Sequence, residues 1–131
     1  MNSELRGLAA DVQLATDMPW GVYSQRGRTW LFTSPGFHPP TLDSDYPDDG
    51  FVLCFAGSRT HVDAGDGEDA QRVLVAIADA LAVLVMDELG RPWPDLEGIG
   101  VLEVELDDQG RVSWARNGQA VCTVGRLASA I

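Results

Sequence analysis

The side chains that could perform acid–base catalysis are few in this sequence. His61 and Asp63 are one residue apart in a strand-like segment, so their side chains would share one face. A histidine oriented by a carboxylate can serve as general base for a nucleophile, and Ser58 and Cys54 are the nearby candidates. The alternative is a surface imidazole beside a carboxylate. We prefer this alternative and assign no catalytic residue, because nothing resembles a nucleophile elbow or a phosphate-binding loop.

A second group of polar residues forms an acidic segment between residues 43 and 69, where Arg59 is the single arginine. The acidic residues in it are Asp43, Asp45, Asp48, Asp49, Asp63, Asp66, Glu68 and Asp69. Oxygen-rich loops bind calcium, but the EF-hand pattern fails because Pro47 occupies the place of a ligand and no glutamate closes the loop. We therefore predict no metal and no other cofactor. The segment is either a solvated loop leading into a helix or a surface for a basic protein partner.

Composition excludes further classes of function. The formal net charge of −11 disfavours nucleic acid and anionic membranes as partners. The longest apolar run is too short to span a bilayer, and the N-terminus does not resemble a secretory signal. Cys54 and Cys122 lie in apolar segments, as reduced and buried thiols do. We expect a cytoplasmic protein whose residues 1–131 form a single domain.

The segment Asp66–Leu89 predicts one long helix that is apolar on almost every side. Asp66 is the expected N-cap, with Asp69 at the third helical position, and Gly90 is the expected residue beyond the end. Such a helix needs cover on both faces, which makes it the centre of the domain.

A helical wheel divides this helix into two sides. The main core stripe consists of Leu74, Ile77, Leu81 and Leu84. The opposite side carries Val75, Asp79, Val83 and Met86, which are too apolar for a freely solvated face. We expect another helix, a loop or a second subunit to cover them, and a homodimer would use these residues as its subunit interface.

Shorter patterns predict the remaining elements. Residues 3–16 suggest a short helix that Ser3 could cap, and residues 20–34 suggest a hairpin. A proline-rich loop, residues 35–50, precedes a second pair of strands at 51–56 and 59–63.

The C-terminal third predicts a three-stranded meander over residues 101–124. Its strands alternate apolar and polar residues, and its turns fall at residues 107–110 and at Asn117-Gly118. The fold class is therefore α+β: an antiparallel sheet, made of two hairpins plus the C-terminal meander, packed on one long central helix with a short N-terminal helix.

Trp93 lies between two prolines after the long helix, and two roles are open for it. It is either a core residue or an exposed anchor for a partner. We group it with Asp43, Asp45, Asp48 and Asp49 as a candidate partner-binding residue.

Three stretches, HVDAGDGED, MDELGRPWPDL and SWARNGQAVCTVGRL, resemble a group of short uncharacterised proteins from high-GC, actinomycete-type bacteria. The resemblance covers roughly residues 51–127 and implies no assigned activity. Members often carry a segment rich in cysteine and histidine after the helix. This chain has Trp-Pro-Asp-Leu-Glu at residues 93–97 instead, so a metal role does not carry over.

Two functions of different class remain. The first is a non-catalytic protein–protein interaction module that binds a basic partner, in its sharpest form an immunity-type inhibitor of a toxin or nuclease. The second is an enzyme or small-molecule-binding protein with a pocket between the long helix, the proline-rich loop and the sheet. His61, Asp63 and Tyr46 would then serve the pocket.

Overall fold

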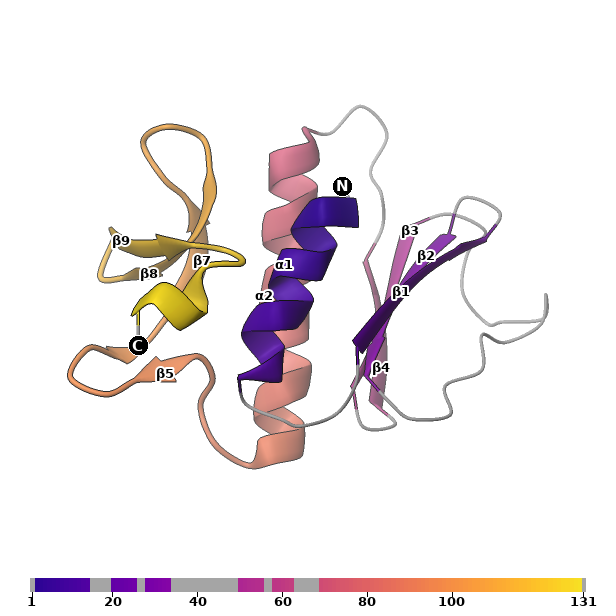
Figure 1. The fold of residues 1–131 in the computed structure, drawn as a ribbon, viewed down its shortest axis with the longest axis horizontal. Helices are drawn as coiled ribbons and strands as arrows, with labels where there is room; N and C mark the ends of the chain where they lie inside the picture. Colours follow the sequence, from indigo (N-terminus) through magenta and orange to yellow (C-terminus); the bar gives the residue numbers. More distant parts are fainter. Residues whose placement is uncertain are drawn as a thin grey trace.

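The computed structural model describes residues 2–14, 20–25, 28–33, 50–55, 58–62 and 69–130. These residues form three layers, with helices in the middle and a β-sheet on each side (Figure 1). The α+β class predicted from the sequence is confirmed. The strands, however, divide into separate sheets on opposite sides of the helices.

The first sheet contains four strands in the order β1 (Trp20–Gln25), β2 (Arg28–Thr33), β3 (Gly50–Phe55) and β4 (Ser58–Val62). Both predicted hairpins are present, because β1 pairs antiparallel with β2 and β3 pairs antiparallel with β4. The sheet is nevertheless mixed, since β2 and β3 run parallel. A purely antiparallel sheet was therefore the wrong expectation. The connection over residues 34–49 is long enough for the crossover that parallel strands require.

Helix α1 (Asn2–Gln13) lies beside the first sheet and contacts both β1 and the long helix. Apolar residues recur along it at helical spacing and are buried; this apolar stripe consists of Leu5, Leu8, Ala9 and Val12. Ser3 is not its cap, because the helix already begins at Asn2. The Ser3 hydroxyl instead donates a hydrogen bond to Glu4 Oε2 at 3.0 Å.

Helix α2 (Ala70–Leu89) is the predicted long helix, with a later start than expected. Asp69 is its N-cap, since the Asp69 carboxylate accepts a hydrogen bond from the Gln71 amide at 2.8 Å. Asp69 is thus not at the third helical position, and Asp66 lies outside the described residues. The predicted end is confirmed: Gly90 has φ 66°, and its amide donates to the Met86 carbonyl at 2.9 Å.

The C-terminal meander is confirmed. It comprises β7 (Glu103–Leu106), β8 (Val112–Arg116) and β9 (Gln119–Thr123), all antiparallel. Asn117 and Gly118 turn the chain with φ of 52° and 79°. Two additions were not predicted: a two-stranded ladder of β5 (Asp95–Leu96) with β6 (Gly100–Val101), and the 3₁₀ helix η1 (Leu127–Ala130).

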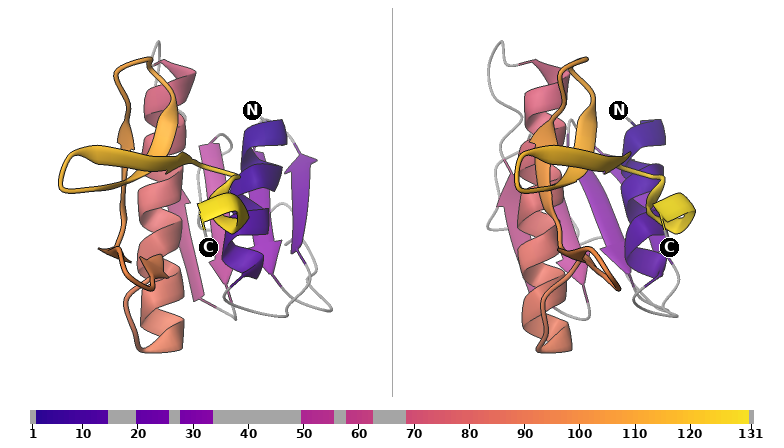
Figure 2. Two further views of the ribbon diagram at one scale, coloured as in Figure 1. Left: turned by 60° about the vertical axis from the view of Figure 1, so that its left-hand side comes forward. Right: turned by 90° about the vertical axis from the view of Figure 1, so that its left-hand side faces the viewer.

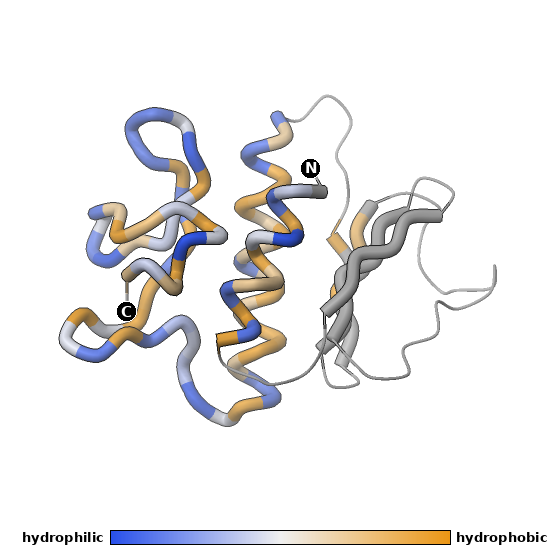
Figure 3. Tube along the Cα trace, in the orientation of Figure 1, coloured by the Kyte–Doolittle hydropathy of each residue, from blue (hydrophilic) through white to orange (hydrophobic). Residues whose placement is uncertain are grey.

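Both flanks of α2 are covered, one by β3 and β4 and the other by β7 and β8. Hydrophobic residues run along its whole length (Figure 3). The buried ones are Val73, Leu74, Ile77, Ala78, Leu81, Ala82, Leu84 and Val85. The cover is not complete around the helix, because the Val83 side chain is 47% exposed. Among the described segments, no helix combines the length and apolarity needed to cross a membrane.

Candidate functional site

A buried polar site surrounds Asp11, near the end of α1. The Asp11 side chain is only 1% exposed. Its Oδ2 accepts hydrogen bonds from Trp114 Nε1 at 2.8 Å and from the Gly125 amide at 2.6 Å. Its Oδ1 accepts one from the Leu127 amide at 3.0 Å. One carboxylate of the N-terminal helix therefore binds β8, the segment after β9 and the start of η1.

The electrostatics of Asp11 reflect this burial. Desolvation raises the pKa of Asp11, and the hydrogen bonds from Trp114, Gly125 and Leu127 oppose that rise. Both carboxylate oxygens are already occupied by N–H donors, and the side chain has almost no contact with solvent. The geometry suits a structural link between the two ends of the domain and leaves no free oxygen for a substrate.

A close backbone contact lies next to this link. A Cβ atom placed on Gly7 would be 3.1 Å from the Gly125 Cα atom, so α1 and the segment after β9 touch through their main chains. Gly125 also has φ 98°, which side-chain-bearing residues rarely adopt. Gly7 weakens the helical propensity of α1, and this close packing against Gly125 favours glycine there.

Sequence reasoning missed this site. Asp11 forms no motif, and its partners are more than a hundred residues away. The available local signal was an acidic residue three positions after Leu8 and directly before Val12, on the edge of an apolar stripe. That signal indicates a carboxylate close to the core, but it does not indicate which groups donate hydrogen bonds to it.

Trp93 belongs to the core. Its side chain is 6% exposed, and its ring meets Trp114 edge to face with centroids 5.4 Å apart and planes at 79°. An exposed anchor at this position was therefore the wrong alternative for the chain described here. The segment after α2 folds back on itself, since the Leu102 amide donates a hydrogen bond to the Pro94 carbonyl at 2.8 Å, and Trp93 packs on Trp114 of β8.

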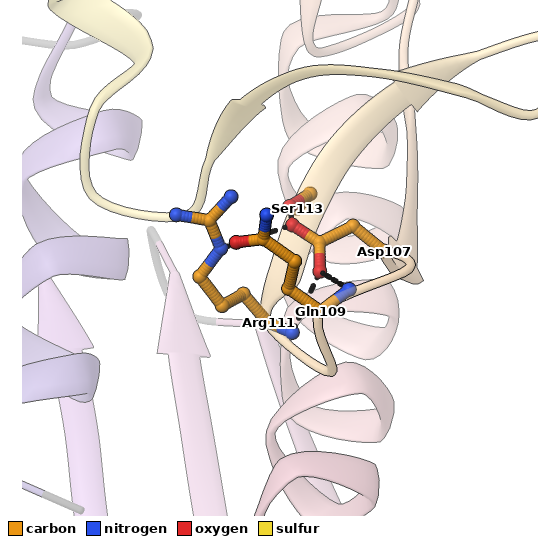
Figure 4. A network of polar contacts seen from close by, with 4 residues as sticks. All are labelled: Asp107, Gln109, Arg111 and Ser113. Atoms are coloured by element: carbon orange, nitrogen blue, oxygen red, sulfur yellow. Dashed lines mark hydrogen bonds and ion pairs between the residues drawn. The ribbon is translucent and has the colours of Figure 1, made fainter.

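A second polar network closes the turn between β7 and β8 (Figure 4). The Asp107 carboxylate accepts hydrogen bonds from the Gln109 and Arg111 amides at 2.9 Å each, from Arg111 Nε at 3.2 Å and from Ser113 Oγ at 3.3 Å. The bond from the Arg111 amide is the main cause that lowers the pKa of Asp107. The network stabilises a tight turn and presents no catalytic arrangement.

The thiol of Cys122 is free and half-buried. Burial raises the pKa of Cys122, and the negative charge of Asp11 raises it further. A thiol with a raised pKa stays protonated near neutral pH and is a poor nucleophile.

Most of the other candidate catalytic residues have side chains that the structure does not describe. Backbone register places Cys54 opposite Arg59 and His61 opposite Val52 across the β3–β4 pair. Cys54 and His61 are thus not direct cross-strand neighbours. Asp63 and Tyr46 lie outside the described residues, as do Asp43, Asp45, Asp48 and Asp49.

The predicted subunit-interface residues are divided by exposure. Asp79 and Val83 are exposed, whereas Val75 and Met86 are half-buried. A shallow groove of about 300 Å³ lies between α2 and β7, and of these four residues Val75 lines it. It is lined by Arg72, Val75, Val104, Glu105 and Leu106.

No cluster of three or more histidine, cysteine, aspartate or glutamate side chains suited to a metal occurs within the described segments. Comparisons with family models, curated proteins and solved structures gave no match to this chain.

Proposed function

We propose that this protein is a non-catalytic interaction module that binds a basic protein partner. The observation that supports this proposal is an excess of acidic side chains over basic ones. The formal charge is −11, and Asp79, Asp87, Asp95, Glu97 and Glu103 are exposed without an ion pair to any described residue. Such a surface attracts basic partners over long range and accelerates their association.

The chemistry of the described site supports this choice over an enzyme. Each carboxylate oxygen of Asp11 and Asp107 already accepts a hydrogen bond from an internal donor, and the raised pKa of Cys122 keeps its thiol protonated near neutral pH. The groove beside α2 and a hollow at Asp95, Leu96, Glu97 and Ala130 have volumes of about 300 and 320 Å³. These volumes lie at the lower limit for small-molecule pockets.

The partner-binding residues in this proposal are Asp43, Asp45, Asp48 and Asp49, and the sharpest form is an immunity-type inhibitor of a basic toxin or nuclease. The proposal places the protein in the cytoplasm, where a free thiol such as Cys122 remains reduced. Nucleic acid is a poor partner for so acidic a chain.

The experiment compares two double variants that remove the same amount of charge. Asp48→Asn with Asp49→Asn neutralises the proposed surface, and Asp95→Asn with Glu97→Gln neutralises an exposed pair on β5 and the following turn. A partner captured from the native host is purified, and its association rate constant is measured at low and high salt.

We expect the first double variant to lower the association rate constant at low salt by about tenfold and the second to lower it far less. High salt should remove the difference. Equal effects of the two variants would show that total charge matters and the 43–49 surface does not. Capture of no partner, or of one whose association ignores salt, would count against the whole proposal.

A further inference from the structure

The exposed side of α2 carries none of the residues that the proposed function assigns to partner binding. Its outward residues recur at spacings of three and four and form one stripe, here called the outer strip. The outer strip consists of Arg72, Ala76, Asp79, Val83 and Asp87, all of them exposed. In Figures 1 and 2 the two sheets and α1 surround α2 on three sides, and no described element lies on the fourth.

We propose that two copies of this chain associate through the outer strip, with their α2 helices antiparallel about a twofold axis. This proposal is independent of the basic partner above. It rests on the order of small, apolar and charged residues along the strip, which is complementary to itself when reversed.

The apolar part of the strip supplies the central contact. Val83 is 47% exposed, which makes it one of the three large hydrophobic side chains exposed in the described chain. Ala76, two helical turns away, is exposed and small enough to let a second helix approach closely. Half-buried Val75 and Met86 border the strip and extend the apolar area.

One register satisfies both the apolar and the charged positions. Suppose that Val83 of one copy faces Ala76 of the second. Because the helices are antiparallel, a step of four residues towards the N-terminus on one copy then matches a step of four residues towards the C-terminus on the other. Arg72 precedes Ala76 by four residues and Asp87 follows Val83 by four, so Arg72 then faces Asp87 of the second copy. The symmetry repeats both contacts.

Within the described residues, nothing occupies the charged ends of the strip. Neither Arg72 nor Asp87 forms an ion pair with any residue that the structure describes. Two ion pairs, one at each end of the strip, would fix the antiparallel direction, as charges at the edges of helix pairs do.

Two features predict that the dimer is weak. The axis passes between positions 79 and 80 and brings the two Asp79 carboxylates to the same side, where they repel each other. The strip is about 22 Å long, so it offers only a fraction of the roughly 800 Å² per partner that stable interfaces bury. The groove lined by Val75 and Val104 adds some area. We therefore expect association at high micromolar concentrations.

The decisive test uses complementary charge reversals. Arg72→Asp places like charges at both ends of a homodimer, and Asp87→Arg does the same with the opposite sign. Each single variant should weaken self-association by about tenfold. An equimolar mixture of the two variants restores both ion pairs and should form a heterodimer as tightly as wild type. Sedimentation equilibrium over a concentration series to about 1 mM measures the association of wild type, of each single variant and of the equimolar mixture.

Further variants separate this geometry from general stickiness. Asp79→Asn should tighten the dimer, and Val83→Glu should abolish it. Arg126→Asp, an exposed charge reversal outside the strip, should have little effect. Circular dichroism verifies that each variant is folded.

Three results would overturn the proposal. Wild type that stays monomeric throughout the series would mean that another part of the chain or another protein covers the strip. Single variants that associate like wild type would rule out the register in which Arg72 faces Asp87 of the second copy. A mixture of Arg72→Asp and Asp87→Arg that shows no heterodimer would do the same.

Discussion

Removal of the Asp11 carboxylate should be the most damaging polar substitution in the described chain. Asp11→Ala leaves the N–H donors of Trp114, Gly125 and Leu127 without an acceptor. A buried donor left unsatisfied costs about 1–3 kcal/mol. The Gly125 bond is only part-buried, and loss of a buried charge relieves the desolvation that raises the pKa of Asp11. We therefore expect a net loss of about 3–5 kcal/mol, a large share of the roughly 5–15 kcal/mol of a typical domain.

Asp11→Asn provides the graded comparison. Its carbonyl oxygen can accept the two bonds that Oδ2 now accepts, while its amide group faces the Leu127 amide as a second donor. The expected loss is about 1–2 kcal/mol. Urea unfolding followed by circular dichroism measures both variants, with exposed Glu97→Ala as control, for which we expect a change below about 0.5 kcal/mol. The reasoning is refuted if Asp11→Ala stays within about 0.5 kcal/mol of wild type, or if asparagine costs as much as alanine.

Three further predictions concern the same region. Gly125→Ala should destabilise the protein by about 1–3 kcal/mol in urea unfolding, because Gly125 has φ 98° and its Cβ would lie 3.2 Å from the Gly7 Cα atom; an unchanged midpoint would contradict the contact. Trp114→Phe keeps an aromatic ring but removes the Nε1 donor to Asp11, with an expected loss of about 1–3 kcal/mol that should be much smaller in an Asp11→Ala background; additive losses would disprove the coupling. Folded Asp11 holds its proton more tightly than the unfolded chain, so the stability it contributes is complete below its ordinary pKa of 3.8 and declines as pH rises through the raised pKa. Urea unfolding at several pH values should show the advantage of wild type over Asp11→Asn decreasing upward from about pH 4, and an advantage that grows instead would reverse the sign.

The clearest local patterns in the sequence correspond to elements of the structure. The apolar run of α2, its terminating Gly90 and the Asn117-Gly118 turn are read from neighbouring residues, and each lies where the sequence indicates. The start of α2 moved to Asp69 because several aspartates precede the helix and any of them could cap it. Local pattern does not choose between equivalent caps.

Contacts between distant parts of the chain were harder to predict from the sequence. The parallel pairing of β2 with β3 depends on how the chain returns across residues 34–49, which strand patterns do not encode. Trp93 packs on Trp114, and Asp11 binds Trp114, through contacts that join distant parts of the chain. Partner binding by the acidic residues within 43–49 remains a prediction, because these residues lie outside the described ones.

The Asp11 link also has a kinetic consequence. Its three hydrogen bonds join residues separated by 103, 114 and 116 positions, so they close nearly the longest loops that a chain of this length allows. Loop-closure entropy must be overcome before such contacts stabilise anything, and high contact order slows folding. On the ribosome, α1 would emerge well before residues 125–127, so the Asp11 carboxylate would lack two of its three donors until those residues were made. The apolar stripe of α1 would stay exposed to solvent or chaperones in the meantime.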